Sequence, residues 1–270
     1  MLVLYEVLGH TYYTNDAYLL TRGCNASTRL TALHYLWKDL LGYLIHPDIP
    51  TRSANLKVAD VATGNGIWLH DLANTMPASC GFHGFDISLD QVGPTAWLPS
   101  NIHMHTWDIF EEPPSKFLSF FDIVHVRLLT FVVKAKDPLL ILMNLTKLLK
   151  PGGYLQWDEA DLSGGSIKAV PGVSTKSLAI ILSQCKLEDG WKYQFTQVMD
   201  DNGYSGSSLY VYKTGLSMAR LWNDLGWKEL VNTVLTTPQI MHELEQKGME
   251  EVRNGAAMVF PTLVWVAKKV

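Results

Sequence analysis

The segment VADVATGNGIW, residues 58–68, most strongly constrains the fold, because an apolar run passes through a glycine-rich turn into a second apolar pattern. A short apolar run that ends at glycines is typical of a buried parallel strand, and the apolar spacing after Gly66 is typical of a helix. A strand, a tight turn and a helix in this order form the first half of a βαβ unit. Ligands of open sheets built from such units bind at the carboxyl ends of the strands.

The same alternation of strands and helices continues as far as Glu159. Strands are predicted at Leu56–Ala62, Cys80–Ser88, Ile102–Asp108, Phe120–Thr130 and Gly153–Glu159, and helices at Asn25–Leu44, Gly66–Met76 and Asp137–Lys150. Further strands are predicted at Lys228–Leu235 and Thr262–Val270, with a helix over residues 237–252 between them. These patterns predict an α/β fold, a Rossmann-like, doubly wound sheet of seven strands whose final strand is antiparallel.

The predicted organisation divides the chain at residue 52. Residues 1–52 are expected to form an N-terminal helical cap, and residues 53–270 are expected to form the ligand-binding domain. Residues 163–214 are less regular, with two adjacent glycines and the run DDNGYSGSS. This segment is interpreted as a lid insertion over the functional edge of the sheet.

Charge and cysteine content argue against several classes of protein. The formal charge is −4 and no run of Lys and Arg is present, so nucleic acid is not expected as a direct ligand. The three cysteines form no CxxC pair, which argues against a disulfide framework and favours a reducing compartment. No basic signal-peptide region and no apolar run of about 18 residues is present, so no membrane association is expected. The cytoplasm is the expected location, with the nucleus as the alternative; the expected partner is a small molecule, and a homodimer is left open.

The glycine turn itself indicates which ligand is held. The stretch Gly64–Leu69 lacks the third glycine of a dinucleotide fingerprint, and the lysine of a phosphate-binding loop is also absent. Asp60 beside the turn would repel a pyrophosphate but suits a cation. S-adenosylmethionine carries a sulfonium and an ammonium group and no phosphate, and the glycines would let the backbone approach it closely. Asp60 is expected to orient the turn by accepting backbone N–H bonds, or to face the ammonium group through water.

Two further acids follow the next two predicted strands. Asp86 can accept from both ribose hydroxyls, and Asp108 can accept from the adenine amino group while Trp107 and Ile109 enclose the ring. Each acid alone is most often a cap or turn residue, but three acids after three successive strands are a more specific pattern. The residues expected around the cofactor are Asp60, Ala62, Thr63, Gly64, Gly66, Asp86, Ile87, Trp107, Asp108, Ile109, His125 and Val126.

The ordered stretches VADVATGNGIW, GFDIS, TWDIF, FDIVHVRLL and LKPGGYLQWDE resemble the motifs of a class I methyltransferase that depends on S-adenosylmethionine. More narrowly, they resemble the fungal secondary-metabolism branch, which includes methyltransferases and LaeA-like regulators. The resemblance spans roughly residues 18–160. Two positions depart from the usual pattern: Ala62 replaces the first glycine of the turn, which is tolerable with a negative φ, and Asn65 stands where a small residue or Thr is common.

The resemblance implies methylation of a small, largely apolar natural product at oxygen, nitrogen or sulfur. Two alternatives stay open: a protein of the same fold that binds the cofactor but acts as a pericyclase or isomerase, and a LaeA-like regulatory protein. A general base is needed only when the acceptor must lose a proton, and His125 is the candidate. A structural role for His125, in which it packs around the cofactor, is expected as much as the role of general base. Arg127 faces the same edge, and Glu159 or Asp161 could bind a polar substrate group or cap the next segment.

His103 and His105 alternate on one strand and therefore point to the same face. A metal site would need a third ligand, and the sequence offers no obvious one. Both histidines are interpreted as structural, and no metal is expected.

Overall fold

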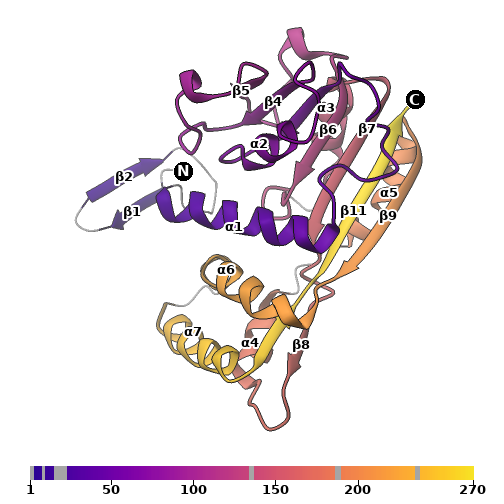
Figure 1. Cartoon of the computed structure of the whole chain (residues 1–270). Coiled ribbons are helices and arrows are strands. Elements are labelled where there is room, and N and C mark those ends of the chain that lie inside the picture. The colour runs from indigo at the N-terminus through magenta and orange to yellow at the C-terminus, as the bar shows by residue number, and fades with distance from the viewer. Residues whose placement is uncertain (1–2, 8–9, 15–22, 134–136, 186–189, 235–237) are drawn as a thin grey trace.

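The computed structural model describes residues 3–7, 10–14, 23–133, 137–185, 190–234 and 238–270 (Figure 1). Its centre is a seven-stranded sheet in the spatial order β5, β4, β3, β6, β7, β11, β9. The strands are β3 (Lys57–Val61), β4 (Gly81–Asp86), β5 (Ile102–Thr106), β6 (Phe121–Arg127), β7 (Leu149–Ala160), β9 (Tyr204–Lys213) and β11 (Pro261–Lys269). The five strands from β5 to β7 are parallel, and β11 runs antiparallel to both of its neighbours.

Helices cover both faces of this sheet, because successive side chains of the central strands are apolar and point to opposite sides. One face packs on α1 (Cys24–Leu41) and α2 (Ile67–Ala73), with Trp37 and Trp68 against Val58 and Val264. The other face packs on α3 (Leu139–Leu148) and α5 (Trp191–Asp201), around Trp157 and Trp265. Two 3-10 turns, η1 (Thr95–Trp97) and η2 (Ser115–Phe117), lie in the loops beside β5.

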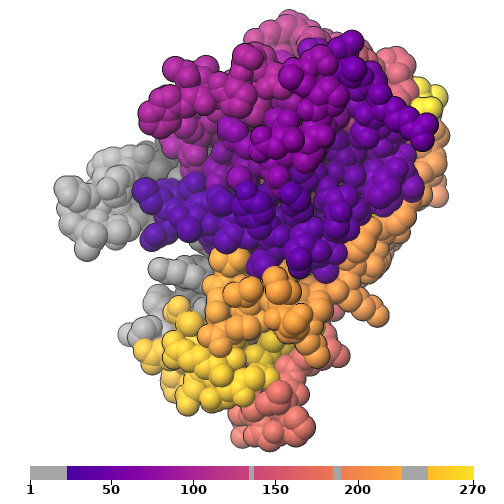
Figure 2. All heavy atoms as spheres, viewed as in Figure 1, coloured from indigo at the N-terminus to yellow at the C-terminus, as the bar shows by residue number. Residues whose placement is uncertain are grey.

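A smaller unit lies beyond α1 and forms the lower part of Figure 1. It consists of β8 (Ser166–Ala169) paired with β10 (Ala256–Val259), together with α4 (Lys176–Cys185), α6 (Leu216–Val234) and α7 (Pro238–Arg253). Glu251 of α7 accepts backbone N–H bonds from Ser177 and Leu178 and so stabilises the first turn of α4. Figure 2 shows the indigo atoms of α1 crossing the molecule directly above the orange atoms of α6. Near the N-terminus, β1 (Val3–Val7) and β2 (His10–Thr14) form a separate antiparallel pair.

The predicted fold class is confirmed, including the seven-stranded doubly wound sheet and the antiparallel final strand. The predicted strand at Lys228–Leu235 is wrong: residues 228–234 belong to α6, and Leu235 lies outside the described residues. The seventh strand is instead β9, which comes from the segment interpreted as a lid. The domain boundaries at residues 52, 163 and 214 stay predictions. In the part of the chain described here, no helix is both long and apolar enough to cross a membrane.

Candidate functional site

The turn after β3 has a left-handed backbone at three positions. The φ angles of Ala62, Gly64 and Gly66 are 58°, 59° and 77°. Glycine adopts this conformation freely, whereas for alanine it is strained. The sequence analysis accepts alanine at this position only with a negative φ, and this condition is not met. The turn therefore carries backbone strain at Ala62. Leu128, just after the adjacent strand β6, is also left-handed at 60°, so strained residues follow two neighbouring strands at the same edge.

The ends of β3, β4 and β5 meet at this turn. The backbone N–H of Gly64 donates to Asp86 Oδ2 at 2.9 Å, which joins the turn to the end of β4. The Trp107 N–H donates to the Asp86 carbonyl at 2.9 Å, which joins the end of β5 to the same residue. Parallel register produces this meeting, because the carboxyl ends of adjacent parallel strands share one edge. The predicted residues from the three strands are therefore neighbours in space.

The other predicted cofactor residues differ in exposure. Ile87 is 45% exposed just after β4. Trp107 and Ile109 are buried in the core that faces α3, and Asp108 accepts the Phe110 N–H at 3.0 Å. Val126 is fully buried in that same core. Their contact with a cofactor stays a prediction.

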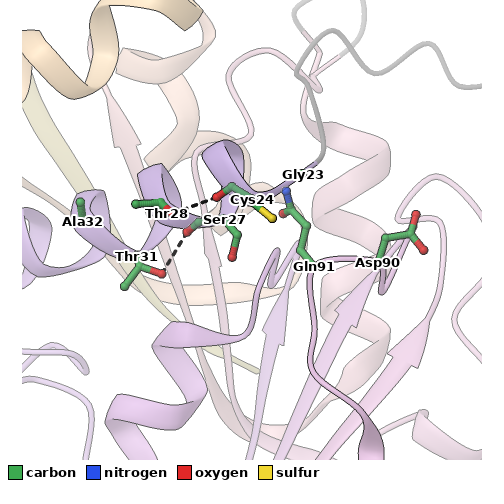
Figure 3. A pocket seen from close by; sticks show the side chains of 8 residues that line it. All are labelled: Gly23, Cys24, Ser27, Thr28, Thr31, Ala32, Asp90 and Gln91. Carbon is green, nitrogen blue, oxygen red and sulfur yellow. Dashed lines mark hydrogen bonds between the residues drawn. The ribbon is translucent and has the colours of Figure 1, made fainter. Parts of the chain in front are cut away.

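A pocket of about 700 Å³ opens beside this edge of the sheet (Figure 3). One wall comes from the N-terminal half of α1, and the facing wall comes from Asp90 and Gln91, in the loop that follows Asp86. The α1 wall bears hydroxyl groups, and Figure 3 shows Thr28 bonded to the Cys24 carbonyl and Thr31 to the Ser27 carbonyl. The lining residues are Gly23, Cys24, Ser27, Thr28, Thr31, Ala32, Asp90 and Gln91.

His125 lies between two buried carboxylates. Parallel register places it beside Asp60, and its Nδ1 is 2.7 Å from Asp60 Oδ1. Its Nε2 faces Asp158 Oδ2 of β7 at 3.5 Å, a contact too long for a strong hydrogen bond. The ring stacks on Trp68 of α2, with centroids 4.0 Å apart and planes 3° from parallel. Only 1% of His125 is exposed, so the imidazole is enclosed on the sheet face that α1 and α2 cover.

The two carboxylates determine the charge of this imidazole. Burial alone lowers the pKa of His125, but the negative charges of Asp158 and Asp60, together with the hydrogen bond to Asp60, outweigh it, so the pKa lies above its ordinary value. The carboxylates have further partners: Thr63 Oγ1 donates to Asp60 at 2.6 Å, and Trp37 Nε1 donates to Asp158 at 3.3 Å. Asp60 therefore orients the turn through a side-chain hydroxyl.

The other polar residues considered at this edge contact other parts of the protein itself. Arg127 lies over the Trp37 ring, 5.6 Å from its centroid, and burial lowers the pKa of its guanidinium. Glu159 accepts the Leu129 N–H at 2.7 Å and the Trp157 Nε1–H at 2.8 Å, and burial raises its pKa. Asp161 accepts the Gly164 N–H at 3.0 Å. The hydrogen bonds of Glu159 and Asp161 therefore hold segments of the protein in place and do not point to an open contact with substrate.

Sequence reasoning missed the roles of Asp158, Trp37 and Trp68. In the sequence, Asp158 is one of three acids in the stretch WDEAD, residues 157–161, and the two tryptophans stand among apolar residues of predicted helices. The alternation of residues along a strand was the available signal, since it places Gln156 and Asp158 on the same face as each other.

His83 of β4 packs against His103 and His105, a contact that the sequence analysis does not predict. Its Nδ1 lies 3.0 Å from His105 Nε2, and its ring lies 5.0 Å from that of His103 between centroids. Phe117, Phe120 and Phe121 surround it. Among the residues described, no group of three His, Cys, Asp or Glu side chains is arranged to hold a metal ion. Burial lowers the pKa of His83 to about 3 and that of His105 to about 4.

We expect this cluster to make the fold sensitive to mild acid. The lowered pKa of His83 means that the unfolded chain binds a proton more readily than the folded chain, so stability is lost as the pH falls below about 6.5. Between pH 6.5 and pH 5 the loss attributable to His83 is about 2 kcal/mol. Urea unfolding over this range measures it, with His83→Gln expected to flatten the profile and the exposed His103→Gln serving as control. Identical slopes for His83→Gln and the parent protein would contradict this account.

Comparison with known proteins assigns the segment that contains the glycine turn to a family. The model of the methyltransferase domain family matches residues 52–203. A methyltransferase, grgD of a Penicillium species, is 35% identical over 154 residues, which are 54% of this chain and 53% of that protein. The N-methyltransferase gliN of Aspergillus fumigatus is 33% identical over 153 residues, which are 55% of this chain and 52% of that protein. The chain spans about half the length of these curated relatives.

More distant matches agree with this family. The secondary metabolism regulator laeA of Coprinopsis cinerea is 31% identical over 102 residues, which are 38% of this chain and 24% of that protein. The structure of Haemonchus contortus phosphoethanolamine N-methyltransferase 2 with S-adenosyl-L-methionine has a TM-score of 0.54 and 13% identity, and the match covers 96% of this chain and 61% of that one. The chain belongs to the methyltransferase domain family, with the class I, S-adenosylmethionine-dependent fold. The resemblance to fungal secondary-metabolism methyltransferases is confirmed.

Proposed function

We propose that this protein binds S-adenosylmethionine at the turn after β3 and transfers its methyl group to a nitrogen atom of a small, largely apolar natural product. The observation that carries the proposal is the hydrogen bond between Gly64 and Asp86, at the ligand-binding edge of the matched domain. The names of the relatives include several N-methyltransferases, which supports nitrogen as the acceptor atom. A homodimer and a place in the cytoplasm or nucleus stay predictions.

The site has the features that this cofactor needs. Gly64 and Gly66 give the turn its left-handed backbone, and the carboxylate of Asp86, at the end of β4, accepts the Gly64 N–H. Asp86 would accept from ribose hydroxyls, and the buried acids Asp60 and Asp158 favour a nearby positive charge. The bound cofactor supplies a methyl group already activated by its sulfonium. The protein then has to hold the acceptor in line with that methyl group, which accounts for a large part of the rate.

A nitrogen acceptor also suits the state of His125. A neutral amine attacks with its lone pair and loses its proton after transfer, so no general base is required. His125 is buried, and its two ring nitrogens face Asp60 and Asp158. We therefore assign to His125 the role of holding these two carboxylates, and general base catalysis is the alternative role that its replacement tests.

Isotope transfer to matched acceptors tests the proposed reaction. The purified protein is incubated with S-adenosylmethionine deuterated at the methyl group and with apolar amines, each paired with its hydroxyl and thiol analogues. We expect labelled product from amines, heavier by one labelled methyl group. Label found only in hydroxyl or thiol analogues would contradict the nitrogen assignment. An altered product of unchanged mass would instead support the pericyclase or isomerase alternative.

A further inference from the structure

Asn65, which departs from the usual residue at this position of the turn, links the turn to α1. Its Nδ2 lies 3.0 Å from the Ser27 carbonyl oxygen, 2.9 Å from Thr31 Oγ1 and 3.2 Å from Ser27 Oγ. Its Oδ1 accepts the N–H of Ile67, the first residue of α2, at 3.2 Å. A single amide therefore holds the glycine turn, the start of α2 and one face of α1 together.

The hydrogen-bond directions fit an amide better than the alternatives. The Thr31 hydroxyl donates its proton to the Ser27 carbonyl, so Thr31 Oγ1 has lone pairs left to accept from Asn65. An Asn side chain has two N–H donors for these acceptors, whereas a threonine hydroxyl has one. An aspartate has no donor and would place a carboxylate against the Ser27 carbonyl.

The part of α1 held by Asn65 borders both the turn and the pocket. Ser27 and Thr31 line the pocket, and Leu30 Cδ1 lies 3.0 Å from where a Cβ on Gly64 would stand. The other half of α1 is joined to α2 by Asp71, which is 2.9 Å from His34 Nε2 and 2.8 Å from Lys38 Nζ. The position of α1 thus determines how much room remains above the glycine turn.

We propose that Asn65 is a positioning residue that seats the N-terminal half of α1 over the glycine turn, and so closes one wall of the cofactor pocket. The seating of α1 follows from the contacts of Asn65 alone. Its effect on the cofactor rests on the proposed function. Asn65 acts through Ser27 and Thr31, which makes the pair Asn65 and Thr31 energetically coupled.

Two measurements on the full chain test this proposal. The first is hydrogen exchange of the backbone amides of residues 24–34 without cofactor, with residues 191–201 of α5 as the internal reference. The second is the dissociation constant of S-adenosylmethionine. Asn65→Asp is expected to raise exchange in α1 and to weaken cofactor affinity, each by about tenfold, while leaving α5 unchanged. Asn65→Thr, which keeps one donor, is expected to have a smaller effect on both.

A matched control and a double-mutant cycle separate positioning from general destabilisation. Asn202→Asp replaces an amide that donates to the Val198 carbonyl of α5, away from the turn. It should raise exchange only near the end of α5 and leave α1 exchange and affinity unchanged, with residues 139–148 of α3 as the internal reference for this variant. Asn65→Ala and Thr31→Val should be non-additive, because each removes the same contact. Additive effects, or unchanged exchange in α1, would overturn the seating. Raised exchange with unchanged affinity would overturn the link to the cofactor. No cofactor binding by the parent protein would overturn the proposed function, while the exchange result still decides the seating.

Discussion

Replacing His125 with alanine is expected to lower the free energy of unfolding by about 3–5 kcal/mol near pH 6, because two buried carboxylates lose the cation between them. Asp60 is 4% exposed and Asp158 is 1% exposed, so both carboxylates would stay buried without a cation between them. His125 has a raised pKa in the folded state. Its charge therefore stabilises the fold fully below the unfolded pKa of about 6.5, and this stabilisation is lost as the pH rises through the folded pKa.

Urea unfolding of the parent protein and of His125→Ala, measured at several pH values, tests this expectation. The difference between the two proteins should be largest at mildly acidic pH and should narrow at alkaline pH. His70→Ala, a half-buried histidine on α2, is the control and should show neither effect. A difference that does not change with pH would attribute the loss to packing on Trp68 instead of to charge.

The same variant decides between the two roles of His125 in the reaction. If His125 holds the carboxylates around the cofactor, cofactor affinity and turnover should fall together. If it is a general base, turnover should fall by about 10²–10⁴-fold with little change in affinity, and the rate of the parent protein should rise with pH as the imidazole loses its proton. The second pattern would contradict the assignment made here.

Replacing Gly64 with valine is expected to abolish cofactor binding, with a loss of affinity of at least about 100-fold. The φ of Gly64 is +59°, a conformation that costs a residue with a side chain about 1–2 kcal/mol. A Cβ there would also meet Leu30 Cδ1 at 3.0 Å, so the branched side chain would push on α1 and intrude beside the turn. Calorimetric titration gives the affinity, and thermal unfolding shows how much of the fold is kept.

The control for this substitution is Gly190→Val, because a Cβ at Gly190 meets no heavy atom within 4 Å and its φ is not positive. This variant should bind the cofactor like the parent protein. Asp86→Ala should weaken binding by a few kcal/mol at most, since it leaves ribose hydroxyls unpaired rather than a buried charge. Unchanged affinity in both Gly64→Val and Asp86→Ala would place the pocket elsewhere.

Hydrophobic pattern predicts the five parallel strands and the antiparallel final strand β11, but it misses the edge strand β9. The strands β3, β4 and β6 are short and mostly apolar and lie between glycines, prolines and polar turns, so their positions are visible locally. The β-branched residues of Lys228–Leu235 favour a strand, yet most of this segment extends helix α6, because propensity is weaker than tertiary context. Strand β9 was missed because Gly203 and the serines after it read as a turn.

The candidate site could be predicted where it follows one strand end, but not where it joins distant elements. The turn and Asp86 were found because each directly follows an apolar run. The enclosure of His125 depends on the register that sets Asp60 beside it and on Trp37 reaching Asp158 from a helix 121 residues away in the chain. No local pattern contains these pairings. The left-handed conformation of Ala62 was likewise invisible, since alanine normally avoids it.

Calorimetric titration of the purified, folded protein with S-adenosylmethionine tests the central claim most directly. The Gly64–Asp86 junction, the pocket beside it and the buried acids lead us to expect saturable binding at about one molecule per chain, with a dissociation constant in the micromolar range. The demethylated product, S-adenosylhomocysteine, should compete for the same site. No heat from either ligand, on protein whose fold is verified in the same sample, would contradict the assignment of this site to the cofactor.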